Sequence, residues 1–127
     1  MLKRFDAYKF HSEVIRHCRK LYGQQNYFHA VFEAAKVYNN LIRDKAQSDK
    51  DGESLMMSVW DPRKGGLKIT PCQTETDCNV QDGIKFLSAG LMRAIRNPTA
   101  HEPALHWPIA EQDATDILAF ISFLLRQ

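Results

Sequence analysis

The sequence predicts an all-α fold, a bundle of four to five helices with one irregular insert around residues 61–79. Two observations lead to this prediction. Apolar residues recur every three or four positions over most of the chain, which places them on one face of a helix. Two glycines and two prolines, which break helices, lie close together between residues 62 and 71, so we expect one irregular stretch. A chain of 127 residues fits one domain, which we assign to residues 1–127.

The first predicted helix runs from about Asp6, an N-cap residue, to about Tyr22, and Gly23 is a natural stop. The second runs from about Asn26 to Lys45 and is the clearest amphipathic helix in the chain. Its apolar stripe is wide and aromatic, so we expect it to lie in the core. The stripe consists of Phe28, Val31, Phe32, Ala35, Tyr38, Leu41 and Ile42.

A polar turn around residues 48–52 precedes a short predicted helix, "ESLMMSVW", whose apolar side chains would cap one end of the core. The insert at residues 61–79 follows. Within it, "LKIT" alternates apolar and polar residues as a short strand does. A loop of this length in a compact domain is either functional or mobile.

The third long helix is predicted to start near Val80 and to end or kink at Pro98, because proline lacks an N–H and clashes with the preceding turn. Leu87 is one of the apolar residues that recur along this helix at three- and four-residue spacing, and its position predicts burial. Gly83 and Gly90 share one face, and small residues there would let another helix approach closely.

The last predicted helix spans residues 110–126 and has more apolar surface than one core face requires. We therefore expect it either to be central to the bundle or to be covered by another chain. Together with the small-residue face of the third helix, this favours a homodimer. The apolar residues are Ile117, Leu118, Phe120, Ile121, Leu124 and Leu125.

Composition limits the compartment and the cofactors. No apolar run approaches the ~20 residues of a membrane span, and the basic N-terminus lacks the apolar segment of a secretory signal. An odd number of cysteines, three, favours free thiols in a reducing compartment. The five residues between Cys72 and Cys78 exceed the usual zinc-clip spacing. We expect a cytoplasmic protein with no membrane partner, no metal and no cofactor.

The segment "AIRNPTAHEP", residues 94–103, is the one most typical of catalysis. The imidazole of His101 can give and take protons at neutral pH, and the guanidinium of Arg96 can hold phosphate oxygens in a planar fork. The pair suits attack of a ribose 2′-hydroxyl on the adjacent phosphate, without a metal. From the residues alone, the alternative is a helix C-terminus with cations near its dipole.

The spacing of this pair requires an irregular backbone. Five residues of a regular helix turn by about 500°, so Arg96 and His101 would point about 140° apart. Pro98 gives the chain a reason to depart from that helix and to bring His101 back toward Arg96.

Three neighbours are candidate supporting residues. Arg93 lies three residues before Arg96, on the same face of the predicted helix, and could add a phosphate contact. Glu102 could orient the imidazole beside it, and Asn97 follows the arginine directly. Plain solvent exposure is the competing interpretation for Arg93 and Glu102.

Three segments, in order along roughly residues 14–125, resemble the HEPN superfamily (higher eukaryotes and prokaryotes nucleotide-binding domain). They are similar in particular to its Ymh-type branch, found in prophage and bacterial defence proteins. The first, "LYGQQNYFHAVFEAAKVYNNLI", matches at Leu21, Gly23, Tyr27, Ala30, Val31, Ala34 and Lys36. The second, "DGESLM", matches at Asp51, Gly52, Leu55 and Met56. The third, "QDGIKFLSAGLMRAIRNPTAH", matches at Gln81, Gly83, Leu87, Gly90, Ile95, Arg96, Asn97, Pro98, Ala100 and His101.

The resemblance implies a HEPN-like bundle that commonly dimerises and places two Arg/His pairs at a shared cleft. It implies a metal-independent endoribonuclease that cleaves single-stranded RNA, acts as a toxin or phage-defence effector, and has an antitoxin or defence-system partner. Arg96 and His101 match the catalytic positions, and Asn97 matches the polar residue that commonly follows the arginine. Pro103 stands where some HEPN toxins have a tyrosine modified by a partner nucleotidyltransferase, so we do not expect that control here.

Two other function classes remain open. Some HEPN members have lost catalysis and bind RNA, nucleotide or a protein partner. A purely structural dimerisation bundle would fit the helices equally well but would leave the Arg96–His101 motif unexplained.

Overall fold

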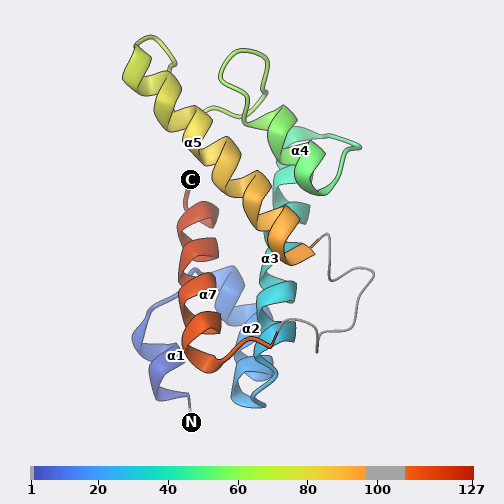
Figure 1. Cartoon of the computed structure of the whole chain (residues 1–127), viewed down its shortest axis with the longest axis vertical. Coiled ribbons are helices and arrows are strands. Elements are labelled where there is room, and N and C mark those ends of the chain that lie inside the picture. The colour runs from blue at the N-terminus through green and yellow to red at the C-terminus, as the bar shows by residue number, and fades with distance from the viewer. Residues whose placement is uncertain (1, 97–107) are drawn as a thin grey trace. The chain divides into compact units, whose positions relative to one another are not determined.

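The structure is a computed structural model that describes residues 2–96 and 108–127 (Figure 1). The described residues form six α-helices and one π-helical segment and contain no strand. The predicted all-α class is therefore confirmed, and the predicted strand at "LKIT" is wrong. The elements are α1 (Lys3–Ala7), α2 (Ser12–Gly23), α3 (Tyr27–Ala46), α4 (Gly52–Val59), α5 (Glu75–Leu91), η1 (Met92–Arg96) and α7 (Glu111–Leu125).

The chain divides into two compact units. The first contains the described residues up to Tyr38 and those from Pro108 onward, and the second runs from Asn39 to the end of η1. The boundary falls inside α3. The assignment of residues 1–127 to a single domain stays a prediction.

The first predicted helix is in fact two helices. Lys9 adopts a left-handed backbone with φ of 52° between them. His11 then caps the start of α2, its Nδ1 accepting a hydrogen bond from the backbone N–H of Glu13 at 3.1 Å. The predicted stop at Gly23 is confirmed, because α2 ends there, and the left-handed residue that follows is Gln25. The prediction missed the break because neither lysine nor histidine is a usual marker of a helix boundary.

Helix α3 confirms the predicted second helix to within one residue at each end. Most of its apolar stripe is buried. Phe28 and Phe32 are only half-buried, and their rings stack with centroids 6.5 Å apart. The aromatic part of the stripe therefore reaches the surface. The fully or nearly buried residues of α3 include Ala30, Val31, Ala34, Ala35, Tyr38 and Ile42.

The insert is shorter than predicted, because α5 begins at Glu75 rather than near Val80. The hydroxyl of Thr74 accepts from the backbone N–H of Asp77 at 3.1 Å, a side-chain cap that satisfies one free donor of the first turn. Two acidic residues in that turn also favour a helix start there. The residues from 75 to 79 are thus helical, and the irregular stretch ends at Thr74.

One face of α5 differs from the prediction. Leu87 is 45% exposed, although its spacing predicts burial. A Cβ placed on Gly83 or Gly90 would meet no atom within 4 Å, so no helix of the second unit packs closely there. The close helix approach that these glycines allow is not made by the described residues of the second unit and stays a prediction for another chain.

Helix α7 confirms the last predicted helix, and most of its apolar residues are buried. Ile117 and Phe120 are half-buried, and Phe123 is 41% exposed. Among the residues that the structure describes, no helix is long and apolar enough to cross a membrane.

Candidate functional site

The predicted catalytic segment begins at the end of η1. Arg96 is the last residue of this π-helical segment. Its side chain lies outside what the structure describes, as do Asn97, His101 and Glu102. The structure therefore defines the backbone that leads into the site, and the convergence of the pair stays a prediction.

The departure from a regular helix starts earlier than we expected. It begins at Met92, well before Pro98, where i to i+5 hydrogen bonding replaces the α-helical pattern. The side chains of Met92 and Ile95 are almost fully buried, so packing fixes the widened turn. The predicted shared face of Arg93 and Arg96 assumed 3.6 residues per turn, and that assumption fails across a π-helical segment.

Arg93 is the one predicted site residue whose side chain is described. It is 77% exposed, and its Nη1 lies 3.7 Å from Oε2 of Glu53 on α4. Exposed pairs of this kind stabilise by roughly 0–1 kcal/mol. Arg93 can therefore exchange this carboxylate for a phosphate at little cost.

The start of α4, which packs against α5 and η1, is held by residues that the sequence did not single out. The fully buried Asn39 accepts from the N–H of Gly52 at 2.9 Å and donates to Oδ1 of Asp51 at 2.7 Å. The same oxygen lies 3.3 Å from Nη1 of Arg43. Gly52 is buried with φ of 60°, a conformation that costs other residues about 1–2 kcal/mol. These contacts and this backbone conformation explain why Asp51 and Gly52 stand together at the start of α4.

The end of α4 and the insert are held by Gln81, which is also fully buried. Its Nε2 donates to the carbonyl oxygens of Trp60 at 3.0 Å and Leu67 at 2.9 Å. Its Oε1 accepts from the N–H of Ile69 at 3.0 Å. One side chain therefore satisfies three backbone groups. Gln81 matched the resemblance, but nothing local in the sequence indicates this role.

One turn further along α5, a charged cluster braces the beginning of the insert. Lys85 is nearly buried, with Nζ 2.8 Å from Oδ1 of Asp82 and 3.6 Å from Oδ1 of Asp61. The hydrogen bond to Asp82 chiefly raises the pKa of Lys85. Backbone N–H groups of Lys64 and Arg63, followed by the charge of Lys85, lower the pKa of Asp61. Lys85 and Asp61 are therefore both ionised at neutral pH.

The cysteines differ in burial, and the buried one, Cys18, is not a reactive site. All three are free thiols. Cys18 is buried, and its thiol donates to the carbonyl oxygen of Ala30 at 3.3 Å. Burial, and secondarily the charge of Glu33, raises the pKa of Cys18 to about 12, so it remains protonated and unreactive. The described residues contain no group of three His, Cys, Asp or Glu placed to bind a metal.

Comparison with protein families matches residues 8–127 to a family described as "Protein of unknown function (Hypoth_ymh)". The chain belongs to the Hypoth_ymh family. The match covers the Gly52 turn, the Gln81 contacts and the π-helical segment. Comparisons with curated proteins and with solved structures give no match.

Proposed function

We propose that this Hypoth_ymh protein is a metal-independent endoribonuclease of HEPN type that cleaves single-stranded RNA, acting as a toxin or phage-defence effector. The observation that supports the proposal is the π-helical segment that ends at Arg96. Such segments are rare, and they frequently occur at functional sites. Here it is fixed by the buried Met92 and Ile95, and it directly precedes the Arg-to-His motif.

In the proposed reaction, His101 takes the proton of the ribose 2′-hydroxyl, and the 2′-oxygen forms a bond to the adjacent phosphorus. The bond to the 5′-oxygen of the next nucleotide breaks, and a proton is returned to that leaving oxygen. Arg96 stabilises the charge on the phosphoryl oxygens. Asn97 and Glu102 position these groups, and Arg93 adds an outer phosphate contact. The products are a 2′,3′-cyclic phosphate and a 5′-hydroxyl.

The test is cleavage of a labelled single-stranded RNA. His101→Ala should lower the rate by roughly 10²–10⁴-fold, because it removes the proton-transfer group. Arg96→Lys should also fail, since lysine keeps the charge but loses the planar fork. Both variants must match the wild type in helicity and oligomeric state.

If the wild type cleaves and His101→Ala cleaves equally well, the assignment of His101 is wrong. If the wild type binds RNA, nucleotide or a protein partner through this segment without cleavage, the protein is a non-catalytic HEPN module instead.

The proposal includes a homodimer, in addition to an antitoxin or defence-system partner. The exposed apolar side chains Val80, Phe86 and Leu87 are 47%, 56% and 45% exposed and lie at helical spacing on α5. Gly83 and Gly90 open space on the same face. A second copy that covers this face would bury on the order of 1,600 Å² in total.

We expect the purified chain to sediment as a dimer at micromolar concentration. Phe86→Asp should shift it to a monomer, because it places a charge in the apolar contact. Ile15→Asp, which likewise places a charge at an exposed apolar residue but on α2, is the matched control and should remain dimeric. A monomeric wild type would contradict this part of the proposal.

A further inference from the structure

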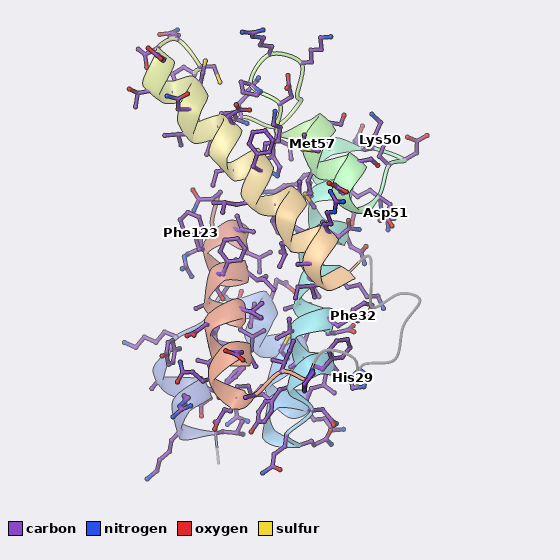
Figure 2. All side chains as sticks on the ribbon, in the orientation of Figure 1. His29, Phe32, Lys50, Asp51, Met57 and Phe123 are labelled. Atoms are coloured by element: carbon purple, nitrogen blue, oxygen red, sulfur yellow. The ribbon has the colours of Figure 1, made fainter. Side chains whose placement is uncertain are left out.

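A cationic surface pocket lies within the second unit, where α4 meets the beginning of the insert. It has a volume of about 530 Å³. Three cations line it: Lys50 before α4, and Arg63 and Lys64 in the insert. Ser54, Met57 and Ser58 line it from one face of α4, and Figure 2 marks Lys50 and Met57.

The one carboxylate in the lining, Asp61, does not neutralise these cations. Its Oδ2 accepts from the backbone N–H groups of Arg63 at 3.1 Å and Lys64 at 2.8 Å. Its Oδ1 faces Lys85. The carboxylate is thus already compensated by backbone dipoles and by a cation outside this pocket. Within the described structure, Lys50, Arg63 and Lys64 have no carboxylate within 4.0 Å.

The loop that carries two of the cations is preformed. The hydrogen bonds to Asp61 fix the backbone of Arg63 and Lys64, and the N–H of Gly65 donates to the carbonyl oxygen of Asp61 at 3.0 Å. A Cβ on Gly65 would collide with the backbone of Val59 and Asp61, so the turn closes tightly. The backbone that carries the side chains of Arg63 and Lys64 is therefore ordered before a ligand binds, which lowers the loss of conformational entropy on binding.

The donors in this pocket suit a phosphate. Arginine offers a planar fork and lysine a compact charge, and both hold phosphate oxygens. The hydroxyl of Ser58 has no hydrogen-bond partner among the described residues and can donate a further bond. Met57, 37% exposed, gives an apolar surface on which a base or sugar can pack.

The pocket also adjoins the element that leads to the proposed active site. Helix α4 packs against η1, and Glu53 on its first turn pairs with Arg93. Ser54, Met57 and Ser58 continue along the same short helix, about 12 Å long at 1.5 Å per residue. A few nucleotides of an extended strand could therefore contact both Arg93 and the pocket.

We propose that this pocket binds backbone phosphates of the single-stranded RNA that flank the scissile phosphate. The inference rests on the proposed function, from which it takes the RNA substrate. It assigns Lys50, Arg63, Lys64 and Ser58 to substrate binding and not to catalysis.

The experiment measures binding of a labelled single-stranded RNA with 2′-O-methyl sugars, which cannot undergo 2′-hydroxyl attack, over a series of salt concentrations. The test variant combines Lys50→Gln, Arg63→Gln and Lys64→Gln. The control combines Lys3→Gln, Lys20→Gln and Arg126→Gln, which removes equal charge from exposed positions of the first unit. Unfolding midpoints of all proteins must agree.

We expect the test variant to raise Kd roughly tenfold at low salt, because three exposed cations no longer face phosphates. The slope of log Kd against log salt should fall by about two, at about 0.7 for each phosphate that the protein no longer neutralises. Ser58→Ala should raise Kd about threefold, as expected for one weak hydrogen bond. With cleavable RNA, the test variant should raise KM and leave kcat unchanged.

Equal Kd and salt slope in the test variant and the wild type would overturn the inference, even if His101→Ala abolishes cleavage. Weaker binding by the test variant alone would support it, even if the wild type does not cleave. Titration with inorganic phosphate distinguishes binding of the RNA backbone from binding of free phosphate. A wild type that binds inorganic phosphate in this pocket but does not bind RNA would overturn the inference.

Discussion

The two ends of α4 are held by buried amides in different ways. At its start, Asn39 bonds the N–H of Gly52 and the carboxylate of Asp51. At its end, Gln81 bonds the carbonyl of Trp60 and reaches two backbone groups of the insert. The two amides thus hold the helix that packs against both α5 and η1.

Each amide bonds three groups, and the difference lies in how many of these groups keep another partner without it. Asn40, which also accepts from Asn39, keeps its hydrogen bond from Arg43. Asp51 also faces Arg43, so it keeps a partner without Asn39. Gln81 bonds three backbone groups at the end of α4 and in the insert. Buried groups that lose a partner cost more than the missing bond itself contributed. Loss of the buried amide should therefore destabilise the protein more at the end of α4 than at its start.

Gln81→Leu should lower the free energy of unfolding by roughly 2–5 kcal/mol, because it leaves one buried and two partly buried backbone groups without a partner. Urea unfolding followed by circular dichroism measures the loss. Gln81→Met, which keeps the length of the side chain, should lose nearly as much, because the missing hydrogen bonds and not the reduced volume cause the effect. A loss below about 1 kcal/mol in both variants would contradict the role of Gln81 as a tether.

Asn39→Leu should lower the free energy of unfolding by less, roughly 1–3 kcal/mol. It removes the hydrogen-bond partner of the Gly52 N–H, whereas Asp51 keeps Arg43 as a partner. It is the matched comparison for Gln81→Leu, because both replace a fully buried amide by leucine. Equal or larger destabilisation by Asn39→Leu would show that the start of α4 is the more sensitive end.

The smallest expected effect is a change in the hydrogen exchange of one backbone amide in the insert. The N–H of Ile69 donates to Gln81, whereas the N–H of Leu67 donates to the carbonyl of Val59 at 3.1 Å. In Gln81→Met, the Ile69 amide should exchange roughly tenfold faster relative to Leu67, as expected for the loss of one hydrogen bond. Hydrogen exchange followed by NMR measures the ratio. An unchanged ratio would show that Gln81 does not protect the insert.

The sequence predicted the elements whose signals are local. The apolar period of α3 and the short pattern of α4 are complete within their own residues, and both helices were predicted closely. The break at Lys9 depends on a single left-handed residue, and the early start of α5 at Glu75 depends on one side-chain cap, Thr74. Neither feature changes the hydrophobic period, so pattern analysis did not find them.

The same distinction applies to the site residues. Arg96 and His101 lie close in sequence and carry recognisable chemistry, so they could be proposed directly. Asn39 meets its partner Gly52 thirteen residues away, and Gln81 meets Trp60 twenty-one residues away. Such contacts exist only in the folded chain. A polar residue inside an amphipathic helix is normally solvated, and only the structure shows that these two are buried.

The most direct test of the central claim is the chemical identity of the cleaved ends. The wild type should cleave single-stranded RNA in the presence of EDTA and leave 2′,3′-cyclic phosphate and 5′-hydroxyl ends, because the attacking group is the RNA's own 2′-hydroxyl. A single 2′-deoxy sugar at the cut position should block cleavage there. Cleavage that stops in EDTA, or that persists at the deoxy position, would contradict the proposed roles of Arg96 and His101.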